Sequence, residues 1–463
     1  MLNTIGYDED SVRGLTAFEH LDPSWGAAGL RLRPNANERL PVLVRLFVAG
    51  ERLTKELVAG VVAPVELGAL AAAGLVECAG AGVRALVRLD PLHGIVVASD
   101  FRERDGSTAR EHVVFPGPAA VALASLTIRA PVSRTLDLFC GSGVQALLAA
   151  RHSETVIATD LNPRALRLAE LSAALSGIDN VHWGQGDLFA PVADDSFDLI
   201  VANPPFVISP SRELMFRDGG HRSDGLSKAV LLGVAERLNE GAYGHVLCSW
   251  VHTTSENWIE PARRWLAGSA CDIVALRFHT QTPATYAIAW TAADGGPPDE
   301  VADRAASWVE YYRSLDVAQI TTAFVALRRR RGQNWVHTDE FVRADWNGGG
   351  SHLARVFEGY DALERVSDDR ALLARPLRLA SGAALIERRR PGTGLDRARL
   401  TNDSGLALPG RIDPPPLAAV LFALDGRRSL TEAAAAAGLA PGDLEAGLSC
   451  VRDLIRRGYL IVT

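Results

Sequence analysis

The stretch LDLFCGSGV, Leu136–Val144, decides the fold class of this 463-residue chain. An apolar run typical of a strand leads into a loop with Gly141 and Gly143, and GVQALLAARH then has the spacing of a helix. Glycines let the backbone turn sharply and let a ligand approach the main chain. The pattern is typical of a ligand-binding loop in an α/β domain, although a strand-to-helix turn can carry it for packing alone.

Strands and helices alternate after this loop. TVIATD, VHWGQGD, FDLIVAN, GHVLCSW, DIVALRF and ITTAFVALRRRR each have the composition of a strand. NPRALRLAELSAALSG predicts a helix, with Asn162 as its N-cap and Gly177 just past its end. This alternation predicts a parallel, doubly wound sheet.

Three successive strands end in acids: Asp137, Asp160 and Asp187. Open α/β sheets bind ligands outside the carboxyl ends of their strands, and an acid about 20 residues after the first strand can accept hydrogen bonds from ribose hydroxyls. Asp160 follows Asp137 by 23 residues. Each acid alone could be a simple N-cap or turn residue. Together, beside a glycine loop, they favour a cofactor site.

The fourth strand stops abruptly at NPPF, Asn203–Phe206. Consecutive prolines cannot continue a helix or a central strand, because each lacks an N–H and has a fixed φ. A strand that ends in an Asn-Pro turn is the ordinary explanation of such a sequence. The glycine loop and the three acids upstream favour a functional one.

In this order the motifs resemble those of the class I S-adenosylmethionine-dependent methyltransferases. The resemblance implies that the glycine loop passes under the methionine and sugar of the cofactor. Asp137 would lie beside the methionine amino group, Asp160 would hold the ribose hydroxyls, and Asp187 would face the adenine amine. The cofactor-binding residues implied are Asp137, Phe139, Cys140, Gly141, Gly143, Asp160, Leu161, Asn162, Asp187, Leu188 and Asn203.

In the same family, Asn-Pro-Pro followed by Tyr or Phe marks enzymes that methylate a planar nitrogen. The nitrogen of an amide or aryl amine is a poor nucleophile, because its lone pair is delocalised. The Asn203 side-chain oxygen and the Pro204 carbonyl can accept its two N–H groups, and Phe206 can stack on the planar group. The catalytic residues implied are Asn203, Pro204, Pro205 and Phe206.

A nicotinamide dehydrogenase is the competing interpretation of the glycine loop. The longer Gly-x-Gly-x-x-Gly fingerprint of such enzymes permits alanine at its last position, where Ala146 stands. The loop alone therefore does not decide between the two classes, and the NPPF motif favours the methyltransferase.

The acceptor is less well defined. GGHRSDGL, which begins at Gly219, resembles a segment of protein-glutamine N5-methyltransferases, with an extra residue. HVVFPGPAAVALA occupies the place of that family's P-R-P-x-T stretch but lacks its arginine and threonine, and Phe206 replaces its tyrosine. Relatives that methylate guanine N2 in ribosomal RNA also have NPPF, usually before a histidine, where this chain has Val207. The resemblance spans about residues 110–330.

The expected fold is α/β: a Rossmann-like seven-stranded methyltransferase domain at 106–333, flanked by winged-helix-like α+β modules at 1–105 and within 334–463. We expect S-adenosyl-L-methionine as cofactor and a protein or peptide acceptor of the glutamine type. An RNA base is the alternative, with Arg328–Arg331 and Arg388–Arg390 as the best local basic patches. A small natural product is a further alternative, and the oligomeric state is not predicted.

Composition limits the other classes. The formal net charge of −7 disfavours a large phosphate-binding surface. No apolar run is long enough to span a membrane, and the polar first residues do not resemble an export signal. The five cysteines are scattered without a C-x-x-C pair, so we expect no disulfide frame, no metal site and a cytoplasmic location.

Overall fold

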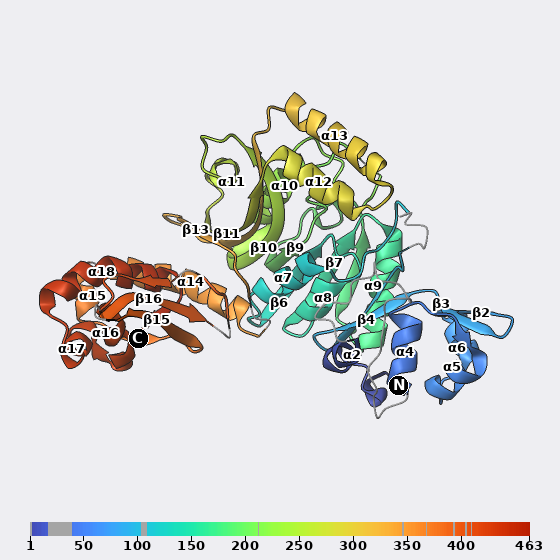
Figure 1. The fold of residues 1–463 in the computed structure, drawn as a ribbon, viewed down its shortest axis with the longest axis horizontal. Helices are drawn as coiled ribbons and strands as arrows, with labels where there is room; N and C mark the ends of the chain where they lie inside the picture. Colours follow the sequence, from blue (N-terminus) through green and yellow to red (C-terminus); the bar gives the residue numbers. More distant parts are fainter. Residues whose placement is uncertain are drawn as a thin grey trace. The chain divides into compact units, whose positions relative to one another are not determined.

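The computed structural model describes residues 2–16, 39–102, 109–211, 213–344, 347–366, 368–391, 394–402, 405–408 and 410–463. The chain forms two compact units (Figure 1). The first consists of residues 1–121, 131–272 and 279–335, and the second of 122–130, 273–278 and 336–463.

The largest sheet has eight strands in the order β13-β11-β12-β10-β9-β6-β7-β8. Their bounds are β6 (Val132–Leu138), β7 (Ser153–Asp160), β8 (Val181–Gln185), β9 (Phe197–Ala202), β10 (Leu238–His252), β11 (Cys271–Gln281), β12 (Gln319–Arg329) and β13 (Val336–Glu340). The five strands from β6 to β10 pair in parallel, β12 runs antiparallel to β10, and β13 runs parallel to β11. This confirms the α/β class.

The sheet has one strand more than the seven predicted. β13 has the sequence VHTDE, which is short and polar, and it begins beyond the predicted domain end at residue 333. A polar segment of this kind lacks the apolar run or alternation that predicts a strand. It joins the sheet through its parallel pairing with β11.

The strand order reverses beside β6, which pairs with β7 on one side and with β9 on the other. Ligands of open α/β sheets bind at such a switch point. Helices connect the strands: α7 (Pro118–Leu126), α8 (Val144–Ala149), α9 (Pro163–Ser176), α10 (Gly225–Arg237) and α11 (Glu260–Trp265), with a short 3-10 turn at Ala190–Val192. Two further helices, α12 (Pro283–Ala293) and α13 (Pro298–Ser314), lie between β11 and β12 in sequence.

Helix α9 begins and ends where the sequence predicts. The side chain of Asn162 caps the helix by accepting the N–H of Arg164, and Pro163 follows at the first turn. Gly177 ends the helix at a φ of 67°, in the left-handed region that favours glycine.

The N-terminal part of the first unit packs on α9. Its elements are α1 (Leu2–Ile5), α2 (Glu9–Thr16), α4 (Arg39–Phe47), β1 (Leu53–Thr54), α5 (Lys55–Val62), α6 (Leu67–Ala72), β2 (Val76–Ala79), β3 (Gly82–Ala85), β4 (Arg88–Leu92) and β5 (Ile95–Ser99). The N–H of Ala98 in β5 donates to the Ser172 hydroxyl of α9 at 2.8 Å. Ala165 and Leu168 of α9 belong to the same apolar core as this region, so the two fold together.

The second unit contains α14 (Gly349–Glu364), α15 (Asp369–Leu373), β14 (Pro376–Leu379), β15 (Ala383–Arg390), β16 (Gly394–Asn402), β17 (Gly410–Ile412), α16 (Leu417–Ala423), β18 (Asp425–Ser429), α17 (Leu430–Ala436), α18 (Pro441–Arg456) and β19 (Leu460–Val462). Its small sheets have the orders β18-β14-β19 and β15-β16-β17. α14 crosses residues 122–130 closely, since a Cβ on Gly350 would lie 2.0 Å from the Thr127 carbonyl oxygen. Within the described ranges, no helix is long and apolar enough to cross a bilayer.

Candidate active site

A cavity of about 400 Å³ lies at the carboxyl ends of β6, β7, β8 and β9. Most of the residues that the sequence singles out meet there. Those that line it are Phe139, Cys140, Gly141, Asp160, Leu161, Asn162, Asp187, Leu188, Asn203 and Pro205. Asp137, Gly143, Pro204 and Phe206 are not among the lining residues.

The glycine loop and the second acid are joined directly. One Asp160 carboxylate oxygen accepts the N–H of Gly141 at 2.8 Å, and the other accepts the N–H of Asn162 at 2.8 Å. Burial raises the pKa of Asp160 above its ordinary value, against the opposing effect of these backbone donors. The loop is thus held against the carboxylate that would bind a ribose.

Gly143 shapes the glycine loop and does not line the cavity. Its φ of 86° lies in the left-handed region, and its N–H closes a turn onto the Cys140 carbonyl at 2.8 Å. A Cβ at this position would lie 3.1 Å from the Cβ of Ala169. Glycine therefore lets the loop and α9 approach closely.

Asp137 lies behind the loop and is 1% exposed. One of its oxygens accepts the Ala146 N–H at 2.8 Å, while the other, Oδ1, is buried and makes no hydrogen bond with any described residue. Burial raises the pKa of this carboxyl to about 8, and the nearby Asp160 charge adds to the shift. Its contact with a cofactor amino group stays a prediction.

The third strand end supplies Asp187, which is exposed, and Leu188, which is half-buried with a φ of 48°. Both line the cavity. The N–H of Gly186 donates to the Asp160 carbonyl at 3.1 Å, which ties this turn to the second strand end.

Cys140 is a buried loop residue, and burial raises the pKa of its thiol well above the ordinary range. A thiol that resists ionisation is a poor nucleophile.

The NPPF residues divide between the cavity and the core. Asn203 is half-buried, and its amide makes no hydrogen bond with any residue that the structure describes. Phe206 packs instead against the apolar cluster that contains Tyr286, and it forms an isolated antiparallel bridge with Asp218. Stacking of Phe206 on an acceptor stays a prediction.

Further lining residues come from two segments to which the sequence assigns no catalytic role. Arg110, His112 and Phe115 precede α7, and Met215, Phe216 and His221 follow the NPPF motif. The segments meet where the Met215 N–H donates to the Arg110 carbonyl at 3.2 Å and where the rings of His112 and Phe216 make an edge contact at 5.9 Å. In the second segment, GGHRSDGL was a sequence signal, because it resembles a segment of protein-glutamine N5-methyltransferases.

Comparisons with known proteins agree with this geometry. Residues 119–216 match the family "Methyltransferase small domain", so the central region contains a domain of that family. It is a class I methyltransferase domain, and the assignment implies S-adenosylmethionine as its cofactor.

Among the curated relatives is the ribosomal protein uL3 glutamine methyltransferase of Bradyrhizobium diazoefficiens. It is 47% identical over 79 residues, which are 16% of this chain and 25% of that protein. A release factor glutamine methyltransferase of Geobacter sulfurreducens is 30% identical over 186 residues, or 36% and 64% of the two chains. An uncharacterised Mycobacterium tuberculosis protein is 30% identical over 153 residues, or 31% and 51%.

The matched stretches cover 25% of the Bradyrhizobium protein and 51% of the Mycobacterium tuberculosis protein. The chain thus spans about a quarter to a half of the length of these two relatives. A solved structure of the ribosomal protein L11 methylase from Lactobacillus delbrueckii subsp. bulgaricus has 20% identity and covers 46% of this chain and 78% of its own. Its TM-score of 0.27 is too low to support an argument.

The residues of the cavity fit S-adenosylmethionine. Asp160, for which the ribose hydroxyls stay a predicted partner, lines the cavity and is held by two backbone N–H groups, and a second acid, Asp187, lines it after the next strand. The orphaned oxygen of Asp137 is a buried acceptor that an ammonium donor would satisfy.

The basic run at 328–331, one of the two predicted phosphate-binding patches, has two of its arginines in ion pairs. Arg328 and Arg330 both pair with the buried Asp272.

Proposed function

We propose that this chain is an S-adenosylmethionine-dependent methyltransferase that acts on the side-chain amide nitrogen of a protein, of the glutamine type. One observation carries the proposal. The Asn203 side chain lines the same cavity as Asp160 and Gly141, and its amide makes no hydrogen bond with a described residue. A half-buried amide of this kind is available to bind another amide.

The mechanism follows from the placement of the residues. S-adenosylmethionine, when bound, supplies a methyl group on a positively charged sulfur. Asp160 would hold the ribose hydroxyls, and Asp137 would accept from the amino group. The Asn203 oxygen would accept an N–H of the acceptor amide and so turn its nitrogen lone pair toward the methyl carbon. Alignment of this kind lowers the barrier to transfer, and the methylated nitrogen would release its N–H proton to water afterwards, so that no strong general base is needed.

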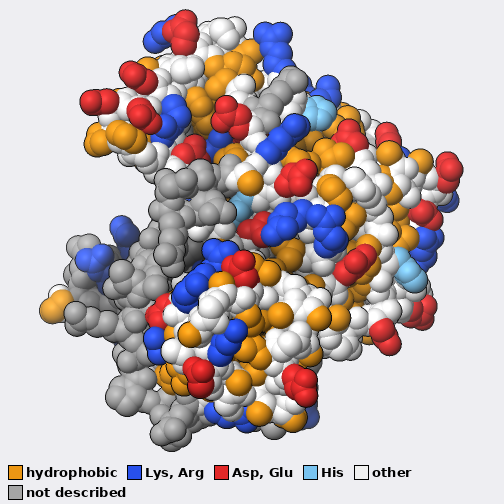
Figure 2. Space-filling view, turned by 90° about the vertical axis from the view of Figure 1, so that its right-hand side faces the viewer, with side chains coloured by type: hydrophobic (Ala, Val, Ile, Leu, Met, Phe, Trp, Pro, Cys, Tyr) orange, Lys and Arg blue, Asp and Glu red, His pale blue; other side chains and the backbone are white. Residues whose placement is uncertain are grey.

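A protein acceptor is favoured over RNA for three reasons. Two of the relatives named above are named glutamine methyltransferases, one of a ribosomal protein and one of a release factor. The net charge is −7, and on the face drawn in Figure 2 acidic and basic side chains are interspersed. Of the basic run at 328–331, Arg328 and Arg330 pair with Asp272, and Arg331 lies 3.9 Å from Glu240.

The proposal extends to the flanking regions and the location. The order β1-β3-β2 with helices α4, α5 and α6, and the order β18-β14-β19 with α16, α17 and α18, support the assignment of both flanking regions as winged-helix modules. A cytoplasmic location is also proposed, since all five cysteines are free thiols.

A methyl-transfer assay tests the function. Purified chain and radiolabelled S-adenosylmethionine are incubated with ribosomal protein uL3, with a release factor, and with a cell extract divided into RNase-treated and protease-treated halves. Label that survives RNase and is lost to protease supports the proposal. Label lost to RNase contradicts it in favour of RNA, and label in neither macromolecule points to a small acceptor or to no turnover.

The variant Asn203→Ala connects the assay to the site. We expect its turnover to fall by about two orders of magnitude or more, as for loss of one transition-state hydrogen-bond partner. Its affinity for S-adenosylhomocysteine, measured by calorimetry, should stay within about threefold, since the ribose acid and the glycine loop are untouched. Full turnover in this variant would remove Asn203 from the mechanism.

A further inference from the structure

Loop 207–224, which follows the NPPF motif in the connection between β9 and α10, contributes to the cavity wall. Six of its residues line the cavity: Met215, Phe216, Asp218, Gly219, Gly220 and His221. Its described residues include no helix and no strand beyond the single bridge at Asp218. The position of the loop therefore depends on contacts with other elements.

Two buried tyrosines hold the start of this loop. The hydroxyl of Tyr286 in α12 accepts the N–H of Ile208 at 3.2 Å, and the hydroxyl of Tyr312 in α13 donates to the Ile208 carbonyl at 2.6 Å. Both tyrosines are completely buried. Ile208 is two residues beyond Phe206. Both the N–H and the carbonyl of the backbone just after the NPPF motif are therefore hydrogen-bonded to the tyrosines.

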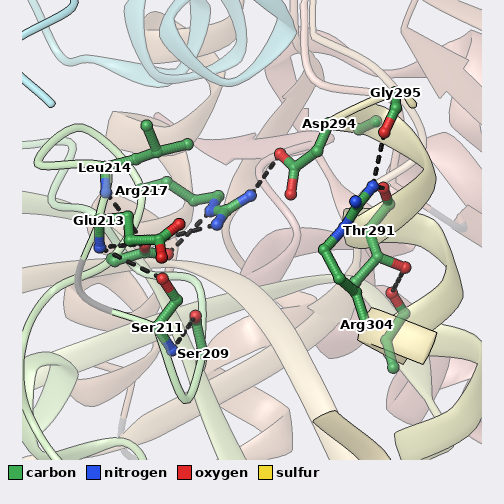
Figure 3. A network of polar contacts seen from close by, with 12 residues as sticks. Ser209, Ser211, Glu213, Leu214, Arg217, Thr291, Asp294, Gly295 and Arg304 are labelled. Carbon is green, nitrogen blue, oxygen red and sulfur yellow. Dashed lines mark hydrogen bonds and ion pairs between the residues drawn. The ribbon is translucent and has the colours of Figure 1, made fainter. Parts of the chain in front are cut away.

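An ion cluster holds the middle of the loop (Figure 3). The guanidinium of Arg217 binds Asp218 at 2.8 Å, pairs with Asp294 just past the end of α12, and lies 5.5 Å from the ring centre of Trp308 in α13. Asp218 accepts the N–H groups of Glu213 and Leu214, each at 3.1 Å.

The charges of this cluster are well compensated. Burial opposes the ionised form of Asp218, but the hydrogen bond from Arg217 and the backbone donors keep its pKa below the ordinary value. The connection that carries Asp294 is itself held, because Arg304 of α13 donates to the Gly295 carbonyl. Figure 3 shows Arg217 reaching from the loop toward Asp294, with Arg304 beyond it.

The end of loop 207–224 also contacts helix α13. The Ser223 N–H donates to the Tyr311 hydroxyl of α13 at 3.0 Å. Contacts at 208, 217 and 223 thus all come from the α12–α13 hairpin, residues 283–314, which itself contributes no residue to the cavity wall. These contacts reach the loop that contributes Met215 to His221 to the cavity wall.

From these contacts we propose that the α12–α13 hairpin is the positioning element for the acceptor: it fixes loop 207–224 so that an acceptor amide can reach Asn203. Tyr286, Asp294 and Tyr312 of the hairpin are the positioning residues, and Arg217 is the partner of Asp294 in the loop. The kinetic part of this inference rests on the proposed function, whereas the fixation of the loop does not.

Hydrogen exchange tests the fixation without any acceptor. In Asp294→Asn the charge that pairs with Arg217 is removed, and Asp294 is partly exposed, so the fold should tolerate the change. We expect amide exchange in 207–224 to accelerate by about fivefold or more. Asp303→Asn, an exposed carboxylate on α13, is the matched control and should leave exchange unchanged. Equal exchange in both variants would overturn the proposal.

Kinetics test the positioning. With the protein labelled in the transfer assay as acceptor, Asp294→Asn and Tyr312→Phe should raise the acceptor KM or lower kcat by about five- to tenfold. The affinity for S-adenosylhomocysteine should stay within about twofold, and Asp294→Glu, which keeps the charge, should recover most of the activity. Loss of cofactor affinity in parallel, or normal kinetics in both variants, would overturn the positioning role.

The two proposals fail in different ways. If the wild-type chain labels no protein, the proposed function fails while hydrogen exchange still decides whether the hairpin fixes the loop. If the wild type labels a protein and Asp294→Asn matches Asp303→Asn in both exchange and kinetics, the function stands and the positioning role is wrong.

Discussion

Replacing Asp137 by asparagine should change how the stability of this protein depends on pH. The carboxyl is 1% exposed, and burial raises its pKa from 3.8 to about 8. In the unfolded chain it would ionise near pH 4, so between about pH 4 and 8 the folded state binds more protons than the unfolded state. The stability that the wild type has relative to Asp137→Asn therefore falls as pH rises through this window.

The magnitude follows from linkage. One pH unit corresponds to about 1.4 kcal/mol, so the relative loss between about pH 5 and pH 8 has an upper limit of roughly 4 kcal/mol. Water penetration and relaxation reduce it, and we expect about 2–4 kcal/mol. For a cooperative unit of this size, that corresponds to roughly 3–6 °C in melting temperature.

Thermal melting of both proteins across this pH range measures the effect. The difference in melting temperature, variant minus wild type, should grow steadily with pH. The asparagine oxygen can still accept the Ala146 N–H, so the local hydrogen bond is retained. Asp187→Asn, at an exposed strand-end acid, is the control and should run parallel to wild type. Parallel curves for Asp137→Asn would refute the reasoning, because the carboxyl would then ionise normally.

Three further substitutions have defined outcomes. Asp160→Ala should weaken S-adenosylhomocysteine binding by roughly 10- to 100-fold in calorimetry, since hydrogen bonds to a charged group are lost, and unchanged affinity would remove Asp160 from the site. Gly143→Ala should lower stability by roughly 1–3 kcal/mol in denaturant titration, because of its φ of 86° and the nearby Ala169; a stability equal to wild type would contradict the strain. Asp272→Asn should cost roughly 3–5 kcal/mol by breaking the buried ion pairs of Asp272 with Arg328 and Arg330 while cofactor affinity is kept, and an unchanged melting temperature would contradict this account of the cluster.

The parts of the site that could be predicted are those fixed locally by sequence. Residues at or just past the end of a parallel strand lie at the edge of the sheet, so Asp160, Asp187 and Asn203 could be assigned to one cavity from the sequence. The glycine positions were equally readable, since Gly141 and Gly143 both adopt positive φ.

The parts that could not be predicted depend on tertiary contacts. Arg217 is an ordinary arginine in sequence, and only the fold brings Asp294, 77 residues away, to its guanidinium. The packing of Phe206 against the apolar cluster of Tyr286 likewise depends on residues distant in sequence, and its stacking on an acceptor stays a prediction. The run at 328–331 resembles a phosphate-binding patch in sequence, but in the fold Arg328 and Arg330 pair with Asp272.

The packing of β5 on α9 has a practical consequence. Helix α9 starts directly after Asp160 and Asn162, and its other side shares apolar contacts with the first hundred residues. A shortened chain that begins near residue 106 would leave Ala165 and Leu168 in water and the hydroxyl of Ser172 without the Ala98 amide. We therefore expect a fragment that folds and binds cofactor to require the N-terminal region, because its removal would expose the apolar side of α9 next to Asp160.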